Sequence, residues 1–283
     1  MKQLHLLMPL LAALFFAACG NLEKEIDLDL PEYQSQYVVE CYLEPGQPFS
    51  LVLTKSVPYF EPFPEDPLEF IEGILVDSAE VSITHNGKTY VLENQLYLNS
   101  TTQKLFNYFN PELVPADFDH DFSLQITTPD GKTITSTTRI LPIVPIDSVV
   151  VEFDEEQDTL ARVLTYLTDD LSQPNYYRRM LHLNSLDSIP DQDFTTFDDF
   201  VDDGQIVFGS GYIFEEGDTA FNTIFHIERA YFEFWESTFN AINANGNPFG
   251  QPSSIISNLS GNANAIGIFT GLSYDRKMTI ITK

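Results

Sequence analysis

The chain has few basic residues and little cysteine, and each scarcity excludes a class of protein. Its 14 Lys and Arg stand against 42 Asp and Glu, which gives a formal net charge of −28. Such a charge repels phosphate backbones, so we expect no nucleic-acid partner. Two cysteines cannot build a disulfide framework. Beyond residue 18 no apolar stretch approaches the roughly 18 residues of a membrane-spanning helix.

The N-terminus has the pattern of a bacterial lipoprotein signal. Lys2 precedes an apolar run from Leu6 to Phe16, which ends at Ala17-Ala18-Cys19-Gly20. The run is too short to span a bilayer and is followed by small residues, as in a cleaved secretory signal. We therefore expect residues 1–18 to be a signal peptide, with Cys19 acylated and anchored in a membrane. The alternative is a secreted protein whose cysteine merely follows the signal.

Residues 19–35 are predicted to be an acidic tether behind the lipidated cysteine. Four acids lie between Glu23 and Asp29, and Pro31 discourages further regular structure. In the Bacteroidota, acids just after a lipidated cysteine direct lipoproteins to the outside of the outer membrane. The predicted location is thus the outer membrane, with the protein facing the cell exterior. A plain solvated tether is the alternative.

Residues 36–141 predict an immunoglobulin-like antiparallel β-sandwich. Short runs rich in Val, Ile, Thr and aromatic residues alternate with turn residues. Asn86-Gly87, between two alternating runs, is a strong hairpin signal. Cys41 falls within the first run, so we expect a buried, inert thiol. The expected strands are 37–43, 49–56, 79–85, 89–93, 122–128 and 133–140.

Residues 142–283 predict a second β-rich domain with one helix near 228–243. The prolines within Leu141–Pro145 indicate a stiff linker, so we place the domain boundary there. Tyr231, Trp235 and Phe239 recur every four residues in a stretch without Gly or Pro, which is helical periodicity. The expected strands are 147–153, 160–167, 176–183, 205–208, 212–214, 265–269 and 277–282. The predicted fold class is therefore mainly β.

The densest acidic cluster is a candidate Ca²⁺ site. It consists of Asp198, Asp199, Asp202 and Asp203, directly before Gly204. Ser210 stands where a helix-loop-helix calcium motif requires a bidentate Glu, so that motif fails. An irregular Ca²⁺ site and a solvated loop remain as interpretations. The run Asp117–Asp121 is either a site for a hard cation, with three carboxylates on one face of a strand and His120 on the other, or an acidic lip leading into a strand. Calcium aside, we expect no cofactor.

No motif in the sequence indicates catalysis. Gly-x-Ser-x-Gly, Ser-x-x-Lys and phosphate-binding glycine loops are absent, and no two histidines have zinc-ligand spacing. The aromatic clusters Tyr212–Phe214 and Tyr231–Phe239 are either sugar-stacking platforms or core. We therefore expect a binding protein that is not an enzyme. A surface hydrolase acting on glycan or peptide is the alternative.

Five short motifs match the Asp-(Ser/Thr)-apolar acceptor pattern of O-glycosylation in the Bacteroidota, where chance would give roughly one. Turn capping by Asp-Ser is the other interpretation. The candidate acceptors are Ser78, Ser148, Thr159, Ser188 and Thr219.

The segment 246–273 is a candidate partner-binding face. It is rich in Gly, Asn and Ser, yet it contains Phe249, Ile255, Ile256 and Leu259. Apolar side chains on a long polar loop need a surface to cover them. Either a partner supplies that surface, or the side chains fix the loop to its own domain.

The order of several short motifs resembles a Bacteroidota outer-membrane lipoprotein family classified as domain of unknown function 4249. The resemblance implies an accessory role at a TonB-dependent receptor, because members are typically encoded next to such receptors. It assigns no catalytic residue. The motifs are Tyr37-Val38-Val39-Glu40, residues 79–87, Pro129-Asp130-Gly131-Lys132, Asp147-Ser148-Val149, Asn175-Tyr176-Tyr177-Arg178, Gly246-Asn247-Pro248-Phe249, Ser257-Asn258 and Gly267-Ile268-Phe269.

Overall fold

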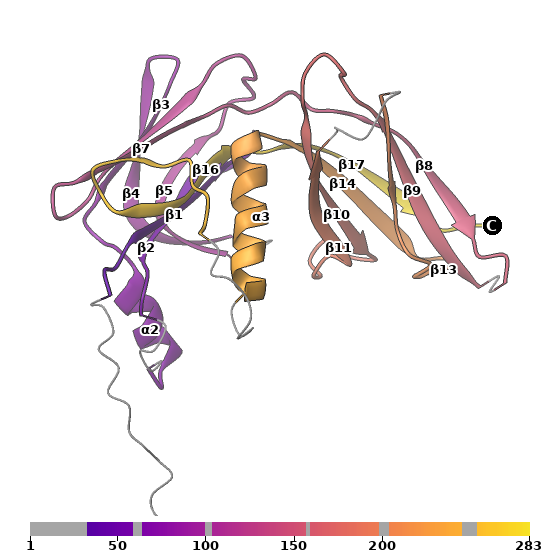
Figure 1. Cartoon of the computed structure of the whole chain (residues 1–283), viewed down its shortest axis with the longest axis horizontal. Helices are drawn as coiled ribbons and strands as arrows, with labels where there is room; N and C mark the ends of the chain where they lie inside the picture. Colours follow the sequence, from indigo (N-terminus) through magenta and orange to yellow (C-terminus); the bar gives the residue numbers. More distant parts are fainter. Residues whose placement is uncertain (1–32, 59–63, 100–103, 157–158, 198–203, 245–253) are drawn as a thin grey trace, which may run out of the picture. The chain divides into compact units, whose positions relative to one another are not determined.

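A computed structural model of the chain describes residues 33–58, 64–99, 104–156, 159–197, 204–244 and 254–283. The chain divides into two compact units, residues 1–34 and residues 35–283. All of the described helices and strands lie in the second unit, which is mainly β and contains several sheets (Figure 1). None of the described helices is long and apolar enough to cross a membrane.

The first half of this unit is built on a nine-stranded sheet that curls around its own core, in the order β15-β7-β6-β3-β4-β5-β2-β1-β16. β4 pairs with both β3 and β5, and its register shifts between Asn94 and Tyr97, so one long strand joins the two halves of a sandwich. Val39, Leu51, Ile83 and Leu124 are among the residues of its buried core. The predicted antiparallel β-sandwich is thus confirmed. Its strands are β1 (Tyr37–Leu43), β2 (Pro48–Lys55), β3 (Glu80–His85), β4 (Lys88–Asn99), β5 (Lys104–Leu113), β6 (Phe122–Thr127), β7 (Thr133–Thr138), β15 (Ser260–Gly261) and β16 (Ala265–Gly271).

The C-terminal part of the chain returns to complete this first sheet. β16 lies parallel to β1, with Tyr37 opposite Ala265 and Leu43 opposite Gly271. Gly267 has φ +134°, and a Cβ there would lie 1.9 Å from the carbonyl oxygen of Val39, so the close pairing requires glycine. The first sheet therefore contains strands from both of the predicted domains. The division into domains 36–141 and 142–283 stays a prediction.

The second half consists of two smaller sheets that face each other. One has the order β11-β10-β14-β17, and the other has the order β12-β9-β13 with β8 paired to β9. Their shared core contains Leu167, Tyr177, Leu181 and Ile224. The predicted second β-rich region is confirmed. Its strands are β8 (Ile146–Phe153), β9 (Leu160–Thr168), β10 (Tyr176–Leu183), β11 (Gln192–Phe197), β12 (Gln205–Gly209), β13 (Phe214–Glu215), β14 (Thr219–Ile227) and β17 (Ser273–Ile280).

Several elements were missed by the sequence prediction, namely β5, β11, β14, β15 and the helix α2 (Pro67–Ile74). β14 shows why. Asn222, Thr223 and His226 interrupt its apolar pattern, yet all three are buried, because β14 lies between β10 and β17. α2 begins at Asp66, whose side chain accepts a hydrogen bond of 2.9 Å from the backbone N–H of Leu68. The strand predicted at 212–214 overlaps β13 only at Phe214, where β13 begins.

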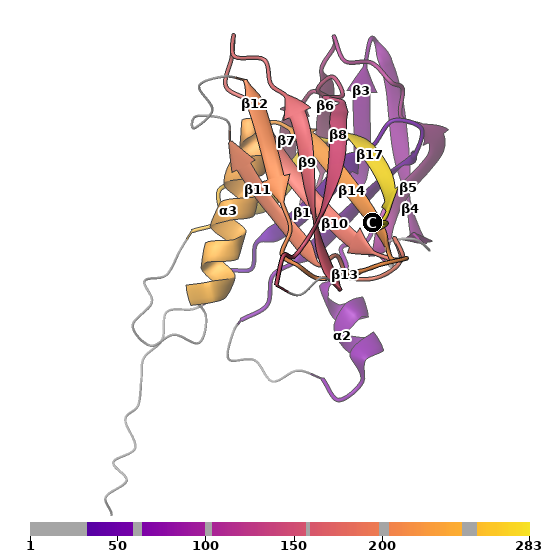
Figure 2. The same ribbon diagram turned by 90° about the vertical axis from the view of Figure 1, so that its right-hand side faces the viewer.

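The predicted helix is confirmed as α3 (Arg229–Ala244), which is displaced by one residue from the expected bounds. Tyr231 is buried, whereas Phe239, two turns later, is 57% exposed. The helix therefore packs at its N-terminal half and leaves apolar side chains uncovered toward its C-terminal end. α3 contacts β16 of the first sheet and both β10 and β11 of the second half (Figures 1 and 2).

An apolar cluster joins the two halves at this helix. Its buried members come from β14, from α3 and from the chain around the β16–β17 junction, and aromatic side chains of β1, β10 and α3 pack against them. The buried members are Phe225, Ile227, Tyr231, Ile268 and Leu272. This cluster fixes the walls of the cavity described next.

Candidate functional site

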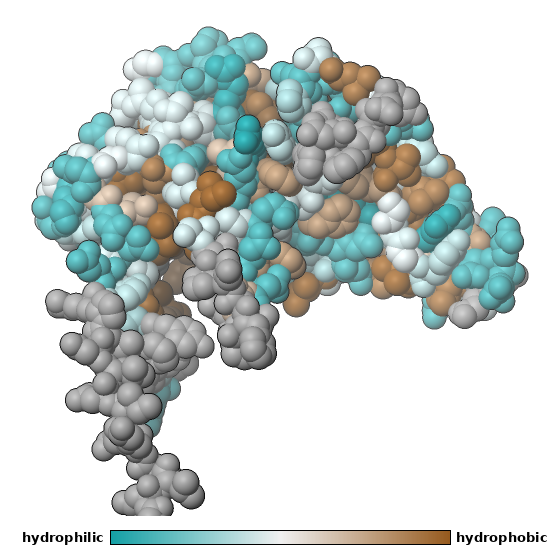
Figure 3. Space-filling view, in the orientation of Figure 1, coloured by the Kyte–Doolittle hydropathy of each residue, from teal (hydrophilic) through white to brown (hydrophobic). Residues whose placement is uncertain are grey.

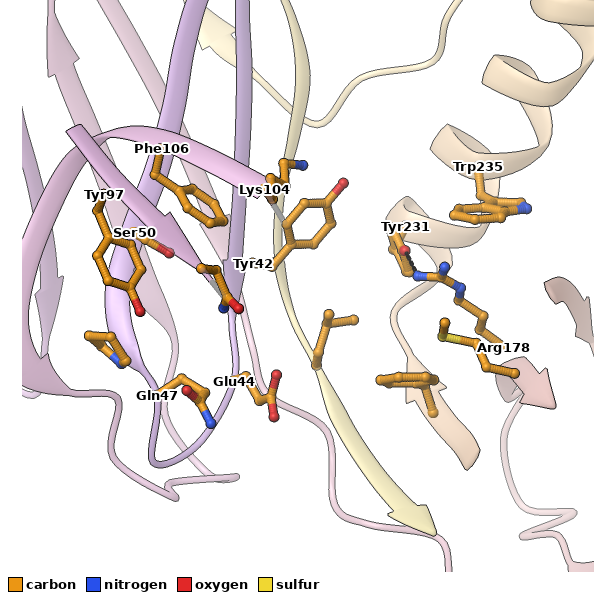
Figure 4. Close-up of a pocket in the computed structure, with 15 residues that line it drawn as sticks. Tyr42, Glu44, Gln47, Ser50, Tyr97, Lys104, Phe106, Arg178, Tyr231 and Trp235 are labelled. Atoms are coloured by element: carbon orange, nitrogen blue, oxygen red, sulfur yellow. Dashed lines mark hydrogen bonds between the residues drawn. The ribbon is translucent and has the colours of Figure 1, made fainter. Parts of the chain in front are cut away.

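A cavity of about 370 Å³ opens beside the cluster that joins the two halves (Figure 4). One wall comes from β1, β2, β4 and β5 of the first sheet, and the opposite wall comes from β10, β14 and α3. Aromatic side chains are prominent on both walls, together with amides, a hydroxyl and charged groups. The aromatic members are Tyr42, Tyr97, Phe106, Phe225, Tyr231 and Trp235. The others are Glu44, Gln47, Pro48, Ser50, Asn99, Lys104, Arg178, Met180 and Leu272.

Arg178 is the most strongly held of the lining residues. Its Nε and Nη2 donate to the two carboxylate oxygens of Asp193 at 2.8 and 2.7 Å, and its Nη1 donates to the hydroxyl of Tyr231 at 2.7 Å. The guanidinium lies 4.1 Å from the ring centroid of Trp235. Burial lowers the pKa of Arg178, but the hydrogen bonding and the charge of Asp193, with the nearby tyrosines, outweigh it and raise the pKa above its usual value. Arg178 is a fixed, permanently charged part of the wall.

Lys104 is held in the same manner on the opposite wall. Its Nζ forms an ion pair with the carboxylate of Glu40. The ammonium group lies 4.8 Å from the ring centroid of Tyr42 and 5.9 Å from that of Phe106. Each cation of the cavity is therefore matched by its own carboxylate and by aromatic rings.

Glu44 is the remaining charged group of the lining. Burial raises the pKa of its carboxyl above the usual value, and a hydrogen bond with Tyr274 and the charge of Arg276 oppose that shift. Arg276 in turn donates from Nε to the hydroxyl of Thr223 at 2.8 Å. The site thus combines three cations (Lys104, Arg178 and Arg276) with three acids (Glu40, Glu44 and Asp193), in a protein whose formal net charge is −28.

The lining offers a ligand aromatic rings, amides, a hydroxyl and charged groups. Glu44 is the one acid among the described residues that line the cavity, and no histidine is among them. Glycoside hydrolysis generally uses two facing carboxylates, and nucleophilic catalysis uses a nucleophile beside a base. Among the described lining residues, neither arrangement is present.

The candidate calcium residues Asp198, Asp199, Asp202 and Asp203 lie outside the described residues. Within the described part of the chain, no group of three or more His, Cys, Asp or Glu side chains is arranged to hold a metal ion.

The run Asp117–Asp121 lies outside any strand and directly precedes β6, so the strand face of three carboxylates is wrong and the acidic lip leading into a strand is confirmed. Asp117 accepts hydrogen bonds from the backbone N–H of Asp119 at 2.9 Å and of His120 at 3.2 Å, and it contacts the rings of His85 and His120. The hydrogen bonds from Asp119 and His120 hold the pKa of Asp117 well below its usual range. Asp121 pairs with Arg139 instead. The carboxylates are therefore divided among different partners.

The structure brings only one of the two predicted aromatic clusters to the cavity. Tyr231 and Trp235 line it, whereas Tyr212 lies elsewhere beneath Arg162, 5.2 Å from its guanidinium. Phe214 is buried in a core of the second half. Sequence reasoning missed Tyr97, which lies beyond the predicted part of β4, and Lys104 and Phe106, which lie on the unpredicted β5. Apolar and aromatic residues are frequent in 96–98 and 105–109, but Asn99 and Asn107 interrupt them, so the available signal was weak.

The candidate partner residues have unlike surroundings, and Phe249 lies outside the described residues. Ile256 is 49% exposed, Ile255 is half-buried, and Leu259 packs against the core of the first sheet. Asn258 holds this segment in place: its side chain bonds the backbone N–H and C=O of Phe269 at 3.1 and 2.7 Å. Fixation to the protein's own sheet therefore accounts for Leu259, and Ile256 keeps a free apolar surface.

The remaining candidates concern covalent modification. Cys19 lies outside the described residues. Cys41 is buried as expected, and burial raises the pKa of its thiol far above the usual value. Of the candidate glycosylation sites, Ser78, Ser148, Thr159 and Ser188 are exposed and Thr219 is half-buried. Glycosylation of these residues stays a prediction.

The chain was compared with curated proteins and with sequence profiles of protein families. No curated protein shows significant similarity to this chain. A sequence profile of a family matches residues 23–278, which is nearly the whole of the described structure. The chain therefore belongs to the family described as domain of unknown function (DUF4249).

Proposed function

We propose that the protein is a non-catalytic, lipid-anchored binding subunit on the outer face of the outer membrane, where it assists a TonB-dependent receptor. The cavity between the two halves would receive the receptor's cargo. The observation that carries this proposal is the aromatic cavity whose cations are held by carboxylates of the protein itself. Such a rigid, preformed wall favours binding without a large ordering cost.

The location rests on Cys19 and on the acids that follow it. Acyl chains contribute about 0.8 kcal/mol per buried methylene, so several chains give stable anchoring. Cys19→Ala should move the protein from the membrane fraction to the soluble fraction. Retention of this variant after a high-salt wash would contradict the lipid anchor.

The receptor partnership rests on the family resemblance and on exposed apolar side chains. Ile256, Phe239 and Ile242 are all substantially exposed, and the backbone N–H of Ile256 donates to the hydroxyl of Ser237 on α3 at 2.9 Å. Apolar residues on a polar surface are typical of contact sites.

A tagged TonB-dependent receptor from the same cell tests the partnership directly. It should co-purify with the wild-type protein from detergent-solubilised outer membranes, and Ile256→Asp with Phe239→Asp should abolish the co-purification. Leu113→Asp is a matched control, because Leu113 is equally exposed but lies at the end of β5. Undiminished co-purification of the double variant would remove this face from the proposal.

A further inference from the structure

We propose that the cavity binds an uncharged saccharide of a few sugar rings. This inference rests on the proposed function only in that the cavity is a cargo site. It assigns a chemical class to that cargo from the charge balance and the composition of the walls.

The charge balance argues for an uncharged ligand. Arg178 directs two of its hydrogen bonds to Asp193 and a third to Tyr231, and Lys104 is paired with Glu40. An anionic ligand would have to compete with these carboxylates and would approach a protein of net charge −28. A cationic ligand would find the faces of Tyr42 and Trp235 already occupied by the protein's own cations.

The walls provide both kinds of contact that a sugar ring needs. Tyr97 and Phe106 project from β4 and β5 toward the open space, beside Gln47 and Ser50 (Figure 4). Aromatic rings pack against the apolar C–H face of a sugar, while amides and hydroxyls bond its hydroxyl groups. A purely apolar ligand would dehydrate these polar groups without replacing their hydrogen bonds, which is costly.

Position and size agree with a short ligand. The register shift between Asn94 and Tyr97 turns the end of β4 so that Tyr97 and Asn99 reach the cavity. Tyr97 stacks on Phe109 with centroids 4.5 Å apart, so its ring is braced from behind. The volume of about 370 Å³ lies at the low end of the range of roughly 300–1,000 Å³ for small-molecule sites. The cavity volume therefore suits a short saccharide rather than a folded polymer.

Elsewhere on the face shown in Figure 3, apolar residues form scattered groups among hydrophilic ones.

Tryptophan fluorescence offers a direct readout, because the chain contains a single Trp and Trp235 lines the cavity. The full lipidated protein is kept in a detergent without a sugar headgroup, since a glycoside detergent would compete for the site. Neutral trisaccharides of glucose, xylose, mannose and galactose are titrated, with trigalacturonic acid and a neutral tetrapeptide as the contrasting probes. Calorimetry on the same samples checks that each fluorescence change is binding.

At least one neutral trisaccharide should bind saturably, and its affinity should change less than about twofold between 50 and 500 mM NaCl, because no net charge is neutralised. Tyr97→Ala and Gln47→Ala should each weaken it about tenfold. Gln47 is exposed, so its variant tests the site without disturbing the fold. Tyr212→Ala is the matched control outside the cavity and should leave affinity unchanged.

Three results would overturn the assignment: no saturable binding of any neutral trisaccharide, binding of the acidic trisaccharide or the tetrapeptide alone, or equal affinity in the Tyr97 and Gln47 variants. The proposed function fails separately, through loss of membrane anchoring or of receptor co-purification. Saccharide binding with no receptor partner would leave this inference standing and remove the accessory role.

Discussion

Two adjacent arginines on β10, Arg178 and Arg179, lie on opposite faces of the strand and have different hydrogen-bond partners. Arg178 faces the cavity and has a carboxylate, a phenol and an indole around it. Arg179 faces the core of the second half, is fully buried, and donates to Gln192 at 2.5 Å, to the carbonyl of Gly209 at 2.9 Å and to Asn222 at 3.0 Å. All three of these acceptors are neutral.

The protonation of the two groups follows from this difference. Asp193 and its neighbours raise the pKa of Arg178 despite the opposing effect of burial, whereas burial lowers the pKa of Arg179 to about 10. An uncompensated charge in a core costs stability unless hydrogen bonds hold it. Arg179 therefore links strands of the second half, whereas Arg178 forms part of the cavity wall.

The largest expected effect is therefore on the core side. Arg179→Ala should lower the free energy of unfolding by about 3–5 kcal/mol, because it leaves a cavity in the core and takes a donor from Gln192 and from the buried Asn222, whose side-chain oxygen keeps only the hydrogen bond from Thr165. Urea unfolding measures the loss. Saccharide binding by the remaining folded protein should be retained. A loss below about 1 kcal/mol would show that Arg179 is dispensable to the core.

A smaller effect is expected on the cavity side. Arg178→Met should cost about 1–3 kcal/mol, since it leaves the carboxylate of Asp193 without its partner at a site that is still partly exposed. The double variant Arg178→Met with Asp193→Asn should recover part of that loss, because no unpaired charge remains. Additive losses in the double-mutant cycle would mean that the two side chains do not interact energetically.

The fold was predictable wherever the signals are local. The alternation of β1 and the Asn86-Gly87 turn, with φ of 48° and 75°, lie where the sequence places them. β5 was not predictable, because its buried Asn107 resembles a loop residue in sequence. In the structure its amide bonds the backbone of Leu53 and the carbonyl of Val76. The parallel pairing of β1 with β16 joins segments at opposite ends of the chain, and no local pattern encodes it.

The site was predictable only on one wall. The helical spacing of Tyr231 and Trp235 singled them out, although the same pattern suited a plain core. The other wall depends on the irregular register of β4, which turns Tyr97 and Asn99 toward the cavity. Arg178 belonged to a motif of the family resemblance, but its pairing with Asp193 depends on β11, a strand that the sequence prediction missed.

Glu44, the acid of the cavity lining, should make stability depend on pH. Because burial raises the folded-state pKa of Glu44 above its unfolded value, its contribution to stability is complete below the unfolded pKa and is lost as pH rises through the folded pKa. Glu44→Gln should thus flatten the dependence of stability on pH above about 4.5. At pH 7 it should raise the free energy of unfolding by less than about 1 kcal/mol. Parallel pH profiles for variant and wild type would show that the carboxyl is not desolvated.

The smallest effect separates the two arginines by ionic strength. Added salt screens the partly exposed pair of Arg178 and Asp193, whereas the neutral acceptors of Arg179 offer little charge to screen. Salt also relieves the self-repulsion of a chain with net charge −28, so it should stabilise every variant, and the informative quantity is the difference from wild type. Between 50 and 500 mM NaCl the cost of Arg178→Met should fall by a few tenths of a kcal/mol. The cost of Arg179→Ala should stay constant. Urea unfolding at the two salt concentrations measures both costs. An equal change in the two costs would mean that the charge of Asp193 does not stabilise Arg178 any more than the neutral acceptors stabilise Arg179.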